Sequence, residues 1–254
     1  MRYPRCNSSF EGAVAQHAEM GDGSPSYPSS GSVLEERAFP GLHASLIGRI
    51  GHLELDANTP ILDLGCGSGA WLERLSRHGF TSLSGVDLDP SGFGAHMVAD
   101  FYKGDVTSDL EFAGTKFGLI TAIEIVEHLS NPERLFCNAA QHLSAAGWFL
   151  LTTPNIYSVQ SRALFLLRAK MRGFDPFEDQ GHVHPLLLLP LVEIILPRYG
   201  LTLVEKWTYP EGPEMSKRAR PRSHRLVRVA VKLVSLVLPN DLPGDALCLL
   251  MRKA

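Results

Sequence analysis

Between residues 60 and 155, short apolar runs alternate with segments whose apolar residues recur at helical spacing. The runs that predict strands are PILDLG, SLSGVD, part of HMVADFYKGD, KFGLITAIEI and WFLLTTPN. The segments that predict helices are AWLERLSRHG and NPERLFCNAAQHLSAAG. Strands that are apolar throughout are buried on both faces, and strands separated by helices usually pair in parallel. We therefore expect an α/β fold with a mostly parallel sheet covered by helices on both faces.

The composition of residues 1–32 differs from the rest of the chain, since they are rich in Ser, Gly and Pro and predict a flexible tail. Residues 33–254 are then a single domain, for which a hydrophobic content of 44% supplies the core. Residues 33–53 predict a helical segment that is broken at Pro40. Beyond residue 155 the pattern predicts the helices SVQSRALFLLRAKMRG and LLPLVEIILPRYG and the strands LTLVEKWTY and DALCLLMRKA.

The first predicted strand ends in a glycine-rich turn formed around Gly65, Gly67 and Gly69. Missing side chains let a ligand approach the backbone, and the N–H groups of the following helix point toward it. Asp87 ends the second strand, where a carboxylate can accept hydrogen bonds from both hydroxyls of a ribose. The pattern predicts a nucleotide-binding corner at the carboxyl edge of the sheet, with a purely structural turn as the alternative.

The glycines alone do not choose the ligand, because Gly65, Gly67 and Ala70 also fit the fingerprint of NAD-type enzymes. The acidic residues around the turn favour a different ligand. Asp63 would repel a pyrophosphate and attract an ammonium group, and Asp105 could accept a hydrogen bond from an adenine amino group. S-adenosylmethionine carries an ammonium group, a sulfonium and a ribose diol but no phosphate. It therefore fits this pattern of acids better than NAD does.

Five segments resemble, in order and spacing, the motifs of class I S-adenosylmethionine-dependent methyltransferases: ILDLGCGSGAWLERL, SGVDLD, KGDV, ITAIEIVEHLSNP and GWFLLTTPN. The resemblance implies a Rossmann-like, doubly wound sheet of seven strands in the order 3-2-1-4-5-7-6, with strand 7 antiparallel. It also implies a methyltransferase that binds S-adenosylmethionine. The cofactor-binding residues that it implies are Asp63, Gly65, Gly67 and Gly69 for the methionine part, Asp87 for the ribose, Leu88, Asp105 and Val106 for the adenine, and Ile123 at the closed end of the pocket.

Glu124, Glu127 and His128 form an E-x-x-E-H segment just beyond the fourth strand, where many N-methyltransferases carry an Asn/Asp-Pro-Pro-Tyr motif instead. The segment resembles that of ubiquinone-biosynthesis O-methyltransferases and of small-RNA terminal 2′-O-methyltransferases. In those enzymes it binds a divalent cation together with a downstream histidine. This resemblance implies Glu124, Glu127, His128 and His182 as ligands of a cation such as Mg²⁺, with His182 favoured over His184. In the alternative, Glu127 and His128 orient the next segment, and His128 or His182 is a catalytic base.

The region after the fifth predicted strand narrows the range of possible methyl acceptors. The stretch TTPNIYSVQSRALFLLRAKMRGF, followed by GHVHP, resembles a bacterial subgroup associated with cell-surface polysaccharide or lipid-linked sugar assembly. Residues 156–190 are therefore expected to form a substrate lid. The expected reaction is O-methylation of a small or lipid-linked acceptor, such as a sugar or an isoprenoid-type molecule. The alternatives are an RNA 2′-O-methyltransferase, an NAD-type oxidoreductase and a non-catalytic scaffold that keeps the cofactor fold.

Residues 212–240 predict a basic amphipathic insertion between the last two strands. Its segment 216–239 has Lys and Arg along one stripe of a helix, with Val, Leu and Ala elsewhere, and contains no acid. Such a helix can lie on an anionic membrane surface, or it can pack on the domain or on a second subunit of a homodimer. The net charge of −3 and the lack of interleaved aromatics argue against nucleic acid as a partner. The first residues lack the apolar run of a secretory signal, so we expect a cytoplasmic protein, in one reading peripheral at the inner face of the membrane.

Overall fold

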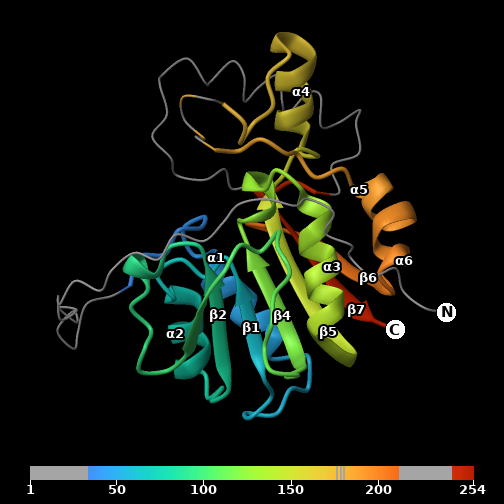
Figure 1. Ribbon diagram of the computed structural model, residues 1–254. Coiled ribbons are helices and arrows are strands. Elements are labelled where there is room, and N and C mark those ends of the chain that lie inside the picture. Colours follow the sequence, from blue (N-terminus) through green and yellow to red (C-terminus); the bar gives the residue numbers. More distant parts are fainter. Residues whose placement is uncertain (1–33, 176, 178, 180, 212–241) are drawn as a thin grey trace, which may run out of the picture.

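A computed structural model describes residues 34–254 apart from 176, 178, 180 and 212–241. Within these residues the chain forms one seven-stranded sheet in the order β3-β2-β1-β4-β5-β7-β6 (Figure 1). The strands are β1 (Ile61–Leu64), β2 (Leu83–Asp87), β3 (Asp100–Lys103), β4 (Phe117–Ile123), β5 (Leu143–Pro154), β6 (Leu201–Tyr209) and β7 (Ala246–Lys253). β7 runs antiparallel to both of its neighbours, and the other pairs are parallel. The expected fold class and strand order are confirmed.

Helices cover both faces of the sheet, as the apolar strands require. On one face α1 (Leu42–Ile50) and α2 (Ala70–Arg77) bury a cluster that includes Leu42, Leu46 and Trp71. On the other face α3 (Pro132–His142) packs beside the continuous helical stretch of α5 (Leu188–Pro190), the π-helical turn η3 (Leu191–Ile195) and α6 (Leu196–Arg198). The short 3₁₀ turns η1 (Pro90–Gly92) and η2 (Val126–His128) lie in loops after β2 and β4. None of the helices in the described ranges is long and apolar enough to span a bilayer.

The sequence pattern extends two helices too far. The helix expected through Gly173 ends at Arg168, and the next residue, Ala169, has a φ of 52°. The helix expected to run through residue 147 ends at His142, and β5 begins at Leu143, which pairs with Phe117. A Cβ on Gly147 would lie 3.1 Å from the backbone oxygen of Phe117, so this glycine permits the close approach of the two strands. Leu143 is buried and fits either a helix or a strand, and only its partner across the sheet decides between them.

The segments that flank the site are described only in part. Of the helical segment expected over 33–53, only the part after Pro40 is helical: residues 34–39 form no helix, and α1 begins just after Gly41, which has a φ of 83°. The expected lid contains the helix α4 (Val159–Arg168) and then irregular backbone. The predicted tail 1–32 and the predicted insertion 212–240, with its basic segment 216–239, lie outside the described residues.

Candidate active site

The glycine turn between β1 and α2 lies at the carboxyl edge of the parallel strands. Gly65, Gly67 and Gly69 all have a positive φ, of 81°, 50° and 80°. A Cβ on Gly65 would come within 2.7 Å of the Ile125 side chain, and one on Gly69 within 2.6 Å of the Ala95 methyl. A Cβ on Gly67 would meet no heavy atom within 4 Å. Two glycines thus permit close packing, and the third leaves its backbone open to a ligand.

Asp87 joins the end of β2 to this turn. Its Oδ2 accepts a hydrogen bond from the Gly67 N–H at 2.8 Å, and its Oδ1 accepts one from the Asp89 N–H at 3.2 Å. A carboxylate has about four acceptor positions, so both oxygens can still accept bonds from a ligand. The neighbouring Leu88 side chain is 65% exposed at the same edge. The corner therefore offers acceptors next to an apolar surface, as a nucleoside requires.

Asp63 is buried beneath the turn and lies in a chain of hydrogen bonds. The Trp71 indole N–H donates to the Thr121 hydroxyl at 3.1 Å, and this hydroxyl donates to Asp63 Oδ1 at 2.7 Å. Burial raises the pKa of Asp63 to about 7, and the charge of Asp87 adds to this, while the Thr121 hydrogen bond opposes it. A cationic group bound here would offset the cost of the buried charge. Thr121 was not predicted, because it lies 58 residues from Asp63 in the sequence, and Trp71 belongs to the network only through Thr121.

The expected adenine side is built from the loop after β3. Asp105 Oδ1 accepts hydrogen bonds from the N–H and the hydroxyl of Thr107, both at 2.7 Å, and the adjacent Val106 is buried. The buried amide of Asn138, on α3, donates to the carbonyls of Val106 and Ser108 at 2.7 Å each. Asn138 fixes this loop, and its place inside an amphipathic helix gave no signal of that role.

The residue that follows β4 has a strained backbone conformation. Glu124 follows Ile123 and has a φ of 52°, which is uncommon for a side chain that carries a Cβ. The buried Thr152 of β5 holds it, because its hydroxyl accepts from the Glu124 N–H at 3.1 Å and donates to Glu124 Oε1 at 3.0 Å. Strain of this kind persists when the surroundings fix it, and it is typical of functional sites. Ile123 itself packs against the cluster under α1 and α2.

Glu127, His128 and His182 form the acid–histidine cluster, in which one potential ligand atom of each residue lies within 4.8 Å of the others. The two imidazole rings are 4.5 Å apart between centroids. Glu127 is fully buried. Its Oε2 accepts from the Thr153 hydroxyl at 3.1 Å, whereas Oε1 has no hydrogen-bond partner among the described residues. Burial raises the pKa of Glu127 to about 7. An orphaned carboxylate oxygen beside two imidazoles fits a divalent cation or a shared proton.

The structure brings His182, and not His184, to the acid–histidine cluster. His182 Nδ1 lies 2.6 Å from the Gly173 carbonyl, so Nδ1 carries the proton and Nε2 is the nitrogen with a free lone pair. The His184 side chain is exposed, and the backbone N–H of His184 donates to the Glu127 carbonyl at 3.0 Å. Burial and the neighbouring His182 lower the pKa of His128, which favours its neutral form. Glu124, the fourth ligand implied by the sequence, is not one of the three residues that the structure brings together.

The sheet order, the glycine corner and the buried acids define a Rossmann-like protein that binds an adenosyl ligand. The chain matches the family model described as "Methyltransferase domain" over residues 36–206, and it belongs to that family, the class I S-adenosylmethionine-dependent methyltransferases. Its fold is that of solved members. A SAM-dependent methyltransferase from Archaeoglobus fulgidus has a TM-score of 0.55 at 19% identity, over 83% of this chain and 92% of that one. One from Mesorhizobium loti has a TM-score of 0.51 at 15% identity, over 84% and 99%.

Curated relatives match a shorter part of the chain. The ubiquinone biosynthesis O-methyltransferase of Azoarcus sp. (strain BH72) is 31% identical over 113 residues, which are 41% of this chain and 48% of that protein. The mitochondrial enzyme of that name from Candida albicans is 28% identical over 110 residues, 39% and 34% of the two chains. The matches thus span less than half of these relatives.

Proposed function

We propose that this protein transfers a methyl group from S-adenosylmethionine to a hydroxyl of a small or lipid-linked acceptor, such as a sugar or an isoprenoid-type molecule. Membership of the methyltransferase family supports the reaction, and the O-methyltransferases among the relatives support oxygen as the accepting atom. The observation that carries the proposal is that the segment leading into the acid–histidine cluster packs against the glycine turn. Ile125, two residues before Glu127, is the side chain that a Cβ on Gly65 would meet.

The cofactor would lie across the corner with its charged end inward. Asp63 would receive the ammonium group of the methionine part, and the open backbone at Gly67 would allow close approach. Asp87 would accept the ribose hydroxyls, and Asp105 would lie near the adenine beside Leu88 and Val106. This assignment follows from matching acids to a ligand with two cationic groups and no phosphate.

Methyl transfer from a sulfonium is an in-line displacement, so the protein's main task is to align the acceptor with the methyl group. A hydroxyl acceptor must also lose its proton. The imidazole of His128 or Nε2 of His182 is placed to accept it. The cluster also has the donor set for a divalent cation, in which Glu127 Oε1 and the two histidines would hold the ion. When bound there, the ion would lower the pKa of the acceptor hydroxyl.

The test is methyl transfer from labelled S-adenosylmethionine to lipid-linked sugars, nucleotide sugars, quinone precursors and RNA, each with Mg²⁺ and with EDTA. Transfer to a hydroxyl of a sugar or of a quinone precursor is expected. Transfer to RNA alone would replace the proposal with an RNA 2′-O-methyltransferase. Loss of turnover in EDTA would support the cation, and full activity in EDTA would assign the proton transfer to His128 or His182.

Calorimetry separates the classes that differ in cofactor. S-adenosylhomocysteine, the demethylated product, is expected to bind and NAD(H) is not, whereas the reverse would indicate an oxidoreductase. Binding without transfer to any acceptor would indicate a non-catalytic scaffold. We also propose a cytoplasmic location, peripheral at the inner face of the membrane, which cell fractionation tests.

A further inference from the structure

The second half of α4 presents large apolar side chains to the solvent. Phe165 is 51% exposed, Leu166 85% and Leu167 80%. Successive residues of an α-helix are rotated by about 100°, so these three side chains together cover more than half of the helix circumference. A helix of a globular protein normally directs one apolar stripe at the core. In α4 the buried residues are Val159 and Ser161, both in its first turn.

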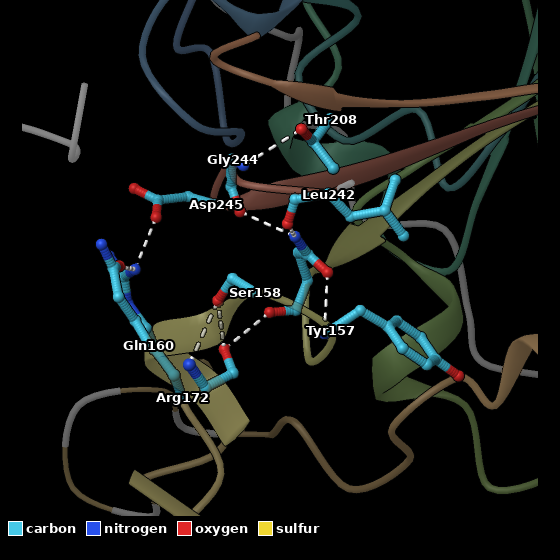
Figure 2. A network of polar contacts seen from close by, with 10 residues as sticks. Tyr157, Ser158, Gln160, Arg172, Thr208, Leu242, Gly244 and Asp245 are labelled. Carbon is cyan, nitrogen blue, oxygen red and sulfur yellow. Dashed lines mark hydrogen bonds and ion pairs between the residues drawn. The ribbon is translucent and has the colours of Figure 1, made fainter. Parts of the chain in front are cut away.

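The base of α4 is held firmly to the domain. The Ser158 hydroxyl caps the helix by accepting from the Ser161 N–H at 3.1 Å, and the Ser161 hydroxyl donates to the Asn155 carbonyl at 2.8 Å. Arg172, just after the helix, pairs with the buried Asp245 at 2.7 Å and donates to Gln160 at 2.6 Å (Figure 2). In Figure 1 the helix stands beyond the carboxyl ends of the strands. The apolar end therefore projects from an ordered polar base.

The helix itself and the residues just after it are basic, and the acids Asp175, Glu178 and Asp179 follow in the next segment. Residues 159–174 contain three arginines and one lysine but no Asp or Glu. Arg172 and Lys170 are paired with Asp245 and Asp175, and Arg168 ends the helix next to Leu167. Long basic side chains around exposed apolar residues are typical of segments that enter the interface of an anionic bilayer.

We propose that the end of α4, residues 165–168, docks the protein on an anionic lipid bilayer. A protein partner with a groove would cover one side of a helix, whereas these side chains point in three directions. Lipid surrounds an inserted helix end and covers all of them. Phe177, which is 87% exposed in the same expected lid, is a further large apolar side chain that faces the solvent.

Docking through α4 would bring the bilayer to the site itself. The irregular backbone after α4 carries the Gly173 carbonyl that orients His182, and the segment 181–184 is bonded to Glu127. An acceptor held in the membrane would then reach the acid–histidine cluster without leaving the lipid. The inference goes beyond the proposed function, because it concerns a surface and can be tested without cofactor or acceptor.

The experiment is flotation of the full-length protein with phosphatidylglycerol–phosphatidylcholine vesicles and with phosphatidylcholine vesicles. Leu166→Glu and Leu167→Glu are each expected to lower the partition coefficient on the anionic vesicles about tenfold or more. Met97→Glu is the matched control, since Met97 is 94% exposed on the loop before β3. It is expected to bind as the wild type does. Any contribution of residues 216–239 cancels, because it is common to all these proteins.

Two results would overturn the inference. One is equal binding by the wild type and both α4 variants, and the other is an equal loss in the Met97 control. Light scattering with size exclusion addresses a second copy of the chain as the occupant. A wild-type dimer that Leu166→Glu converts to a monomer, with unchanged vesicle binding, would assign the surface to self-association instead. Retained S-adenosylhomocysteine binding shows that each variant is folded.

Discussion

The ionised carboxylate of Asp63 is expected to lower the stability of the cofactor-free protein and to raise its affinity for the cofactor, and Asp63→Asn tests both effects. Burial raises the pKa of this carboxyl from 3.8 to about 7. Between these pH values the native state binds more protons than the unfolded chain does, so the free energy of unfolding falls as the pH rises. A shift of about three pKa units corresponds to an upper limit of about 4 kcal/mol above pH 7.

Asparagine has nearly the same shape, can accept the Thr121 hydrogen bond through its amide oxygen and does not ionise. The cofactor-free variant is therefore expected to be more stable than the wild type at pH 8, by up to about 4 kcal/mol. Near pH 4 the difference is expected to fall below about 1 kcal/mol, because the folded carboxyl is then protonated and the unfolded one, with a pKa of 3.8, is about half ionised. The affinity of the Asp63→Asn variant for S-adenosylhomocysteine is expected to fall, because the ammonium group of the ligand loses its carboxylate partner.

Urea unfolding from pH 4 to pH 8, without cofactor, measures the stability difference, and titration calorimetry measures the affinity. Asp89→Asn is the matched control, since Asp89 lies at the same edge and hydrogen bonds from Ser91 lower its pKa. Its removal is expected to give no gain in stability at any pH. Parallel pH profiles for wild type and Asp63→Asn would refute the reasoning, since Asp63 would then titrate alike in the folded and unfolded states.

Three further predictions concern the same site. Thr121→Val is expected to weaken S-adenosylhomocysteine binding about tenfold or more in calorimetry, because a hydrogen bond to a charged group contributes roughly 1.5–3 kcal/mol, and Thr121→Ser is expected to restore it. Gly69→Ala is expected to lower the free energy of unfolding by more than about 1 kcal/mol, because Gly69 has a positive φ and its added Cβ would lie 2.6 Å from the Ala95 methyl. Gly67→Ala is expected to reduce the affinity for the cofactor more than the stability, because its added Cβ would meet no protein atom. Glu127→Gln is expected to lower kcat about 100-fold with unchanged cofactor affinity, and an unchanged kcat would remove the cluster from the chemistry.

The fold was predictable because its signal is local. β1 and β2 are short apolar runs closed by Gly65 and Asp87, β4 and β5 are longer apolar runs, and Gly79 ends α2 as expected with a φ of 95°. The boundary at Leu143 was not predictable, because a buried leucine suits both the end of α3 and the start of β5. Its pairing with Phe117, far away in the sequence, decides the matter.

The candidate site likewise contains residues that the sequence pattern predicts and residues that it does not. The acids of the cofactor corner follow strand ends and could be found by pattern, whereas Thr121 and Asn138 act through partners distant in sequence. The choice of His182 over His184 came from resemblance, and the geometry of the cluster agrees with it. Glu124 matched the motif, but a motif does not contain the Thr152 hydroxyl that draws its carboxylate toward β5.

Glu127 has two functions in one residue, because its carboxyl faces the histidines while its carbonyl accepts the N–H groups of Val183 and His184 at 2.8 and 3.0 Å. Exchanging the side chain alters the first function and leaves the second intact. A change in the length of the loop 181–184 would alter both at once. An insertion or a deletion in this loop is therefore expected to disturb the cluster even where Glu127 itself is unchanged.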